Sequence, residues 1–179
     1  MALAFPLELT TPRLVLRPFS QDDVQSVVAI QSNWKVTRNL RLATWPPTEE
    51  SISAWLAGHE GEWRDGTAHR FALQLEGRVI GCCDLDGIDD GLGFLGYWLG
   101  QPHWGKGLAT EAGRAVVDLA RTTLGLTTLE TGHVDDNPAS GGVLRKLGFH
   151  EVGRTKLWSK PREEEITQVQ YRAKLAGND

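Results

Sequence analysis

The residues most able to do chemistry lie in a short glycine-rich segment, residues 103–111 (HWGKGLATE). Glycines at positions 105 and 107 allow a tight turn that presents successive backbone N–H groups to one point. An apolar stripe at helical spacing follows, so the segment should open a helix, whose N-terminus adds about half a positive charge. The segment predicts an anion-binding cradle suited to a pyrophosphate, although the same pattern also fits a glycine turn that binds no ligand.

Two other glycine patterns compete with this interpretation. Residues 91–96 match G-x-G-x-x-G, but a dinucleotide fingerprint follows a strand and opens a helix, whereas this run leaves an Asp-rich turn and enters a strand-like segment. Residues 100–106 match the start of a Walker A loop, yet Gly107 stands where Ser or Thr would hold magnesium, and Pro102 removes an amide. The dinucleotide and ATPase interpretations are therefore disfavoured.

The elements that must position this segment alternate between hairpins and helices. Strands are expected at residues 13–18, 71–75, 79–85, 94–99, 128–134, 151–157 and 165–173. Helices are expected at residues 20–30, 48–65, 105–124 and 138–147, with an irregular stretch at 34–47. Antiparallel hairpins with one strand–helix–strand crossover predict an α/β (α+β) fold with a mixed sheet.

The composition sets the class of protein. The 179 residues, with 40% hydrophobic and 23% charged content, predict one soluble domain over residues 1–179. A net charge of −4 without a basic run argues against nucleic-acid binding. The sequence shows no signal peptide and no membrane span, so a cytoplasmic protein is expected. The adjacent Cys82 and Cys83 are expected to be reduced and packed rather than paired or metal-bound.

Four segments flanking or surrounding the loop resemble the GNAT N-acetyltransferase superfamily, and especially its branch of ribosomal-protein N-terminal (alanine) acetyltransferases. They are residues 11–19 (TPRLVLRPF), 96–99 (GYWL), 136–140 (DNPAS) and 146–149 (KLGF). The resemblance spans nearly the whole chain. It implies a single GNAT domain, a mostly antiparallel sheet with splayed central strands, helices on both faces, and acetyl-CoA as co-substrate without a metal.

In that family the loop binds the pyrophosphate of acetyl-CoA through backbone amides, and the preceding strand pairs with the pantetheine arm like an added strand. The resemblance implies that the cofactor-binding residues are Trp98, Leu99, Gly105, Lys106, Gly107, Leu108, Ala109, Thr110 and Asn137. Asn137 is equally suited to cap a helix that starts at Pro138. Trp104 departs from the family motif, which usually begins with Gln or Arg.

The resemblance also bears on the acid that protonates the leaving thiolate. Ser140 matches a family position near the sulfur, although a serine in a first helical turn is more often a solvated hydroxyl. Many members place a tyrosine acid four residues later, where this chain has Leu144. Ser140 is therefore our candidate acid by elimination.

The base is less clear, because residues 92–99 contain no Asp or Glu where many members carry a glutamate. Asp84 and Asp86, spaced by two, would share one face of a strand, or they are solvated residues at its end. His69 and His103 are weaker candidates. We take Asp84 as the catalytic base. The oxyanion is expected to bind a backbone amide near Leu99, as in the family.

The acceptor must be a neutral amine. An α-amino group is roughly a tenth neutral at pH 7, and a lysine about four times in ten thousand. We therefore expect direct attack by a primary amine, with the N-terminal α-amine of a protein as first candidate and a small amine (polyamine, aminoglycoside, amino acid) as the alternative. A catalytically weak acyl-CoA-binding sensor is a further alternative, and a homodimer is left open. The tryptophans at 34, 45, 55 and 63 either shape the acceptor pocket or pack in the core.

Overall fold

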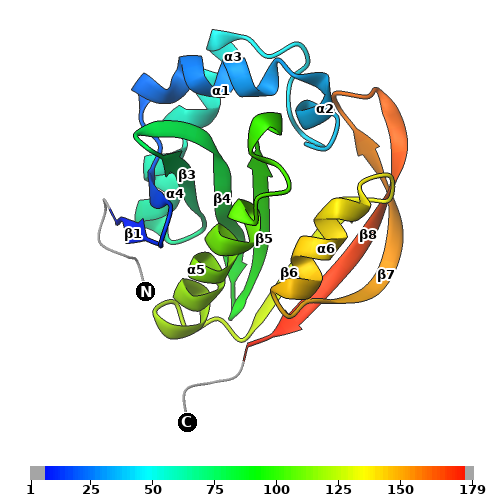
Figure 1. Cartoon of the computed structure of the whole chain (residues 1–179). Helices are drawn as coiled ribbons and strands as arrows, with labels where there is room; N and C mark the ends of the chain where they lie inside the picture. Colours follow the sequence, from blue (N-terminus) through cyan, green and yellow to red (C-terminus); the bar gives the residue numbers. More distant parts are fainter. Residues whose placement is uncertain (1–6, 176–179) are drawn as a thin grey trace.

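The computed structural model describes residues 7–175, which form a curved sheet covered by helices (Figure 1). The strands are β1 (Leu9–Thr10), β2 (Val15–Pro18), β3 (His69–Leu75), β4 (Arg78–Asp89), β5 (Leu92–Leu99), β6 (Thr128–Val134), β7 (His150–Ser159) and β8 (Glu164–Lys174). The helices are η1 (Gln21–Asp23), α1 (Val24–Gln31), α2 (Trp34–Thr37), α3 (Glu49–Ala57), α4 (His59–Asp65), η2 (Gln101–His103), α5 (Leu108–Thr122) and α6 (Pro138–Lys146).

The sheet has the order β1-β2-β3-β4-β5-β6-β8-β7 and is antiparallel except between β5 and β6. Helices α5 and α6 lie in front of it in Figure 1, where the apolar stripe of α5 packs on Leu95 and Leu99. A second apolar cluster joins α1 and α3 to Cys82 and Trp98 on the opposite face. The alternation of β5 therefore sends odd-numbered side chains to α5 and α6 and even-numbered ones to the other face.

The centre of the sheet opens at the β5–β6 junction. The two strands pair only from Leu92–Thr128 to Phe94–Glu130 and carry no ladder pairing beyond that point. At the end of the pairing, the Thr131 hydroxyl donates to the Leu95 carbonyl at 2.7 Å, taking a place that a backbone amide fills in a regular sheet. This gap confirms the expected splay of the central strands.

Most elements match their sequence-based expectation, but β1 and η2 were not expected, and two helical segments differ. The expected helix over residues 48–65 is two helices, α3 and α4, which meet at Gly58. Glycine is a poor helix residue, and the break lets His59 and Trp63 turn inward as buried side chains. The stretch expected to be irregular contains the short helix α2, which Asn33 caps through its side chain. Cys82 and Cys83 are buried free thiols, as expected.

Candidate functional site

The glycine-rich loop leads directly into α5. Gly105 and Gly107 have φ values of 72° and 76°, in the left-handed region that glycine enters without strain. The first amide of α5 to bond into the helix is that of Glu111, which donates to the Gly107 carbonyl at 3.0 Å. Within the described chain, the amides of residues 105–110 have no backbone acceptor. They form a cluster of donors at a helix N-terminus, which is where an anionic group binds.

Trp104 joins this loop to the end of β5. Its indole N–H donates to the Leu99 carbonyl at 2.8 Å, while the side chain as a whole remains exposed. The residue that departs from the family motif thus anchors the start of the loop. It also occupies one main-chain acceptor that would otherwise face the gap.

Beside the loop, β5 presents a main-chain edge without a neighbouring strand. Trp98 is opposite Cys82 in the β4–β5 ladder, and the Gly100 amide bonds the Ile80 carbonyl at 2.8 Å. Main-chain groups alternate in direction along a strand, so those of Tyr97 and Leu99 point toward the gap. Among the residues expected at the cofactor, Leu99 therefore lies on this edge. The Trp98 side chain packs near Trp55 on the opposite face, with ring centroids 6.5 Å apart.

Helix α6 places the two residues expected on its first turn beside the same gap. Asn137 is the N-cap residue, but its side chain makes no capping hydrogen bond, which leaves the amide available for a ligand. The Ser140 hydroxyl lies 2.6 Å from the Tyr97 phenol, and the phenol also donates to the Ser140 carbonyl at 3.1 Å. Leu144 is fully buried in the core beneath the helix.

Tyr97 was expected only to contribute backbone to the site, and its side chain is a candidate functional group that sequence reasoning missed. Burial raises the pKa of its phenol well above the usual value, although the Ser140 hydrogen bond opposes the shift. The phenol therefore stays protonated at neutral pH and acts as a hydrogen-bond donor. The alternation of side chains along β5 could have indicated this, because Tyr97 is odd-numbered and therefore lies on the face covered by α6.

Asp84 lies on the opposite face of the sheet in a network of charges. It pairs with Arg70 at 2.9 Å, and Arg70 also pairs with Asp86 at 3.2 Å and with Glu62 at 2.7 Å. Asp84 is only 8% exposed, so it is not the solvated residue of the alternative interpretation. Burial raises its pKa, with Arg70 opposing the shift. A carboxyl with a raised pKa is a better proton acceptor than an exposed one when it is ionised.

Gly96 makes room for this carboxylate. A Cβ built at Gly96 would lie 2.3 Å from Asp84 Oδ1, so the carboxylate rests directly on the β5 backbone. Asp84 therefore reaches across to the strand that borders the gap. That strand contains no Asp or Glu of its own over residues 92–99.

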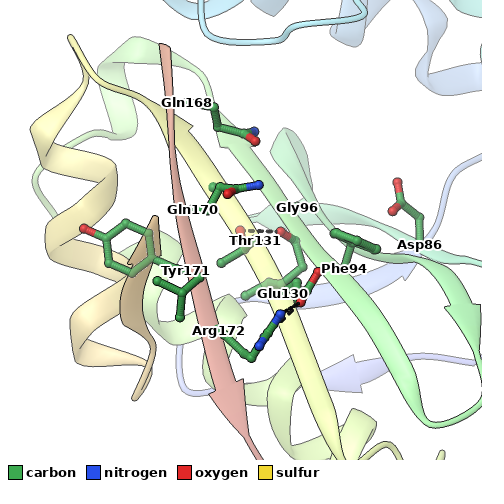
Figure 2. Close-up of a pocket in the computed structure, with 12 residues that line it drawn as sticks. Asp86, Phe94, Gly96, Glu130, Thr131, Gln168, Gln170, Tyr171 and Arg172 are labelled. Carbon is green, nitrogen blue, oxygen red and sulfur yellow. Dashed lines mark hydrogen bonds and ion pairs between the residues drawn. The ribbon is translucent and has the colours of Figure 1, made fainter. Parts of the chain in front are cut away.

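A cavity of about 280 Å³ opens between β5, β6 and β8 (Figure 2). It is bordered by Gly96 and by polar side chains that include Asp86, Glu130, Gln168 and Gln170, with the partly exposed Phe94 at one side. Glu130 is tied to Arg172, as Figure 2 shows by the dashed contact. The cavity therefore offers polar contacts, but its two carboxylates are already ion-paired, Asp86 with Arg70 and Glu130 with Arg172.

Arg162, in the β7–β8 turn, contacts two other segments at the open end of the gap: the loop between β6 and α6, through Asp136, and the segment between α2 and α3, through Arg38. Arg162 bonds both oxygens of Asp136 at 2.9 and 3.0 Å and also donates to the Arg38 carbonyl at 2.7 Å. Trp34 and Trp45 contact each other here with ring centroids 4.9 Å apart and planes tilted by 56°, and both remain partly exposed. Trp63 is core, and Trp55 packs against the second apolar cluster. Two of the four tryptophans are thus available to an acceptor.

The two histidines considered as bases lie elsewhere. His69 is fully buried against Trp63, with ring centroids 4.5 Å apart. Burial lowers its pKa to about 4, so its ring is neutral and enclosed. His103 belongs to η2 ahead of the loop, and burial lowers its pKa, with Lys106 adding to the shift. No group of three metal-ligating side chains occurs among residues 7–175, and no helix in that range is long and apolar enough to span a membrane.

A cluster of free amides at a helix N-terminus, an unpaired strand edge and a hydroxyl pair around one gap are the features expected of an acyl-CoA-dependent transferase. A family model described as an acetyltransferase (GNAT) domain matches residues 13–150. The chain therefore belongs to the GNAT family and is an acetyl-CoA-dependent N-acetyltransferase.

Individual relatives agree with this assignment. An uncharacterised N-acetyltransferase, p20, of Bacillus licheniformis is 31% identical over 157 residues, which cover 85% of this chain and 87% of p20. The ribosomal protein uS5 alanine N-acetyltransferase of Escherichia coli K12 is 26% identical over 162 residues, 84% of this chain and 81% of that enzyme. The fold matches Mycobacterium smegmatis RimJ, solved with CoA-disulfide, at a TM-score of 0.85 and 20% identity, over 97% of this chain and 90% of RimJ.

Proposed function

We propose that this enzyme acetylates the α-amino group at the N-terminus of a protein or peptide. The observation that carries the proposal is that the carboxylates nearest the gap are ion-paired: Asp84 and Asp86 with Arg70, and Glu130 with Arg172. Paired carboxylates suit an acceptor that is already partly neutral, as an α-amine is at pH 7 and a lysine is not. The similarity to the uS5 alanine acetyltransferase supports the same acceptor class.

The donor fits the loop and the strand edge. The amides of residues 105–110 would hold the pyrophosphate of acetyl-CoA, because they converge at a helix N-terminus and lack backbone acceptors in the described chain. The main-chain groups of Tyr97 on this edge would pair with the pantetheine amides, and the Asn137 side chain would lie beside them. Acetyl-CoA would supply the acetyl thioester, and the Leu99 amide is our candidate donor to the oxyanion.

Asp84 and Ser140 divide the proton transfers between the two faces. Asp84 takes a proton from the bound ammonium, directly or through a water, and the neutral nitrogen then bonds to the thioester carbonyl carbon. As the carbon–sulfur bond breaks, the Ser140 hydroxyl gives its proton to the leaving sulfur, so that CoA leaves as a thiol, and Ser140 recovers a proton from the attacking nitrogen through water. Tyr97 holds Ser140 by a hydrogen bond, and when the single phenol hydrogen turns from the Ser140 carbonyl to Oγ, the serine hydrogen is free to turn toward the sulfur.

The test uses peptides that differ only at their N-terminus. Peptides with a free N-terminal Ala or Ser and one internal lysine would be incubated with acetyl-CoA, beside the same peptides with blocked N-termini. We expect CoA release only from the free peptides, with the acetyl group located on the α-amine by tandem mass spectrometry. Modification of the blocked peptides on lysine would contradict the proposal.

The alternatives are separated by the same assay. Turnover of polyamines, aminoglycosides or free amino acids with no turnover of peptides would indicate a small-amine acetyltransferase. Tight CoA binding without turnover of any acceptor would favour an acyl-CoA sensor. This alternative is kept because the buried Leu144 stands where many family members have a tyrosine acid.

A further inference from the structure

The phosphate-binding loop is held from outside the gap by a segment far away in the sequence. Arg13, between β1 and β2, donates from Nη1 to the Lys106 carbonyl at 2.9 Å and from Nε to Glu111 at 2.6 Å. The Arg13 backbone amide and the Thr11 hydroxyl also donate to Glu111, at 2.8 and 2.6 Å. One carboxylate in the first turn of α5 thus receives three hydrogen bonds from residues 11–13.

This contact sets the direction of a ligand-facing amide. The Lys106 carbonyl and the Gly107 N–H belong to the same planar trans peptide, so they point in opposite directions. Because Arg13 draws the carbonyl to its own side, the Gly107 N–H is turned away from Arg13. With a φ of 76°, Gly107 has no side chain to fix this peptide, and the peptide is otherwise free to rotate.

The pairing also removes an electrostatic conflict. Glu111 lies in the first turn of α5, where an unpaired carboxylate would compete with a phosphate for the positive end of the helix. Burial opposes ionisation of Glu111, but the bonds from Thr11 and Arg13 outweigh it and lower its pKa. The carboxylate is therefore charged, and the Arg13 guanidinium compensates that charge.

We propose that Arg13 and Glu111 are positioning residues that preorganise the loop for a donor carrying a pyrophosphate. Neither touches the reacting atoms; they act through the peptide between Lys106 and Gly107. The inference rests on the proposed function, in which residues 105–110 hold the pyrophosphate of acetyl-CoA.

The experiment compares two donors that carry the same thioester. Acetyl-CoA has the pyrophosphate, and S-acetylpantetheine lacks it. For Arg13→Ala we expect the KM for acetyl-CoA and the Kd for CoA to rise about tenfold while kcat stays within about twofold, since preorganisation is lost but the chemistry is kept. The kcat/KM for S-acetylpantetheine should change less than about twofold, because this donor makes no use of the loop. Arg13→Lys and Glu111→Gln should show smaller shifts in the same direction.

Arg17→Ala is the matched control. Arg17 is also an arginine at the N-terminal edge of the sheet, and it pairs with Asp23 at 2.8 and 2.9 Å instead of the loop. It should lower the thermal unfolding temperature without changing the Kd for CoA. If Arg13→Ala folds poorly, Arg13→Lys carries the test.

The outcomes separate this inference from the function on which it rests. Equal losses with both donors, or an unchanged Kd for CoA in Arg13→Ala and Arg13→Lys, would overturn the positioning role while the acetyltransferase assignment stands. Failure of the unaltered protein to bind CoA at all would overturn the proposed CoA site and this inference with it.

Discussion

The Tyr97 phenol lies 2.6 Å from the Ser140 hydroxyl and links β5 to α6 across the gap in the sheet. Leu144, one turn later in α6, stands where the family resemblance places a tyrosine acid, and it is 0% exposed. A hydroxyl at that position would be enclosed in the core. In this chain the phenol is instead that of Tyr97 on β5, and it contacts α6 at Ser140.

This pair predicts the effect of removing either hydroxyl. Ser140→Ala should lower kcat about a hundredfold, within the range for loss of a general acid, and Tyr97→Phe about tenfold, with little change in KM. The double variant should be no slower than Ser140→Ala, because the phenol acts through the serine.

Tyr171→Phe is the control for loss of a phenol, since the protein has two tyrosines. The Tyr171 hydroxyl accepts from Arg145 at 3.2 Å and points away from the cavity in Figure 2. This variant should keep kcat within about twofold. Losses that add in the Tyr97/Ser140 double variant would contradict a shared role.

The sequence predicts local features of this fold well because they depend on neighbouring residues. Residues 76–77 and 90–91 have positive φ at the expected hairpin turns, and β6 spans the expected residues 128–134. The loop before α5 is likewise local, since its glycines and the amphipathic helix lie together in the chain. The conformation of the glycine-rich loop and the helix after it could be predicted for this reason.

The catalytic surroundings could not be predicted in the same way. A two-residue hairpin turn continued in regular register would set Arg70 opposite Cys83. A bulge in the β3–β4 ladder shifts the register by one and sets it opposite Asp84 instead. Contacts such as Arg13–Glu111, 98 positions apart, depend on the assembled sheet. No spacing rule in one sequence identifies them.

The network around Asp84 predicts a pH-dependent defect. Asp84→Asn keeps the shape but cannot accept a proton, so kcat/KM for a peptide should fall about a hundredfold at pH 7. At pH 9 the defect should shrink, because most of the α-amine is then neutral without help from a base. Initial rates from pH 6 to 9 measure the difference.

Glu62→Gln tests whether this effect belongs to the base or to the network as a whole. Glu62 is a partner of Arg70, at 2.7 and 3.0 Å, and sits on α4. Its loss should lower stability and leave the shape of the pH–rate profile unchanged. A defect in Asp84→Asn that is constant across pH would argue against a catalytic role.

Gly96 should be sensitive to a single added methyl group. In Gly96→Ala the new Cβ would meet Asp84 Oδ1 at 2.3 Å, which forces the carboxylate or β5 to move. We expect the free energy of unfolding, measured in denaturant, to fall by about 1–3 kcal/mol and the activity to fall as well. Gly142→Ala is the control, since nothing lies within 4 Å of its Cβ, and stability there should stay equal or rise by up to ~1 kcal/mol.

His59 predicts how stability changes in acid. It packs against Trp55 and Phe19, and burial lowers its pKa to about 4, with Arg70 adding to the shift. The unfolded chain binds a proton here below about pH 6.5 and the folded chain only near 4, so folding loses stability as pH falls through that window. The loss approaches about 1.4 kcal/mol per pH unit from this group. His59→Phe keeps an apolar ring in the same cluster, and urea titrations between pH 6 and 5 should show a correspondingly shallower decline. A decline as steep as that of the unaltered protein would mean that His59 is not the group responsible.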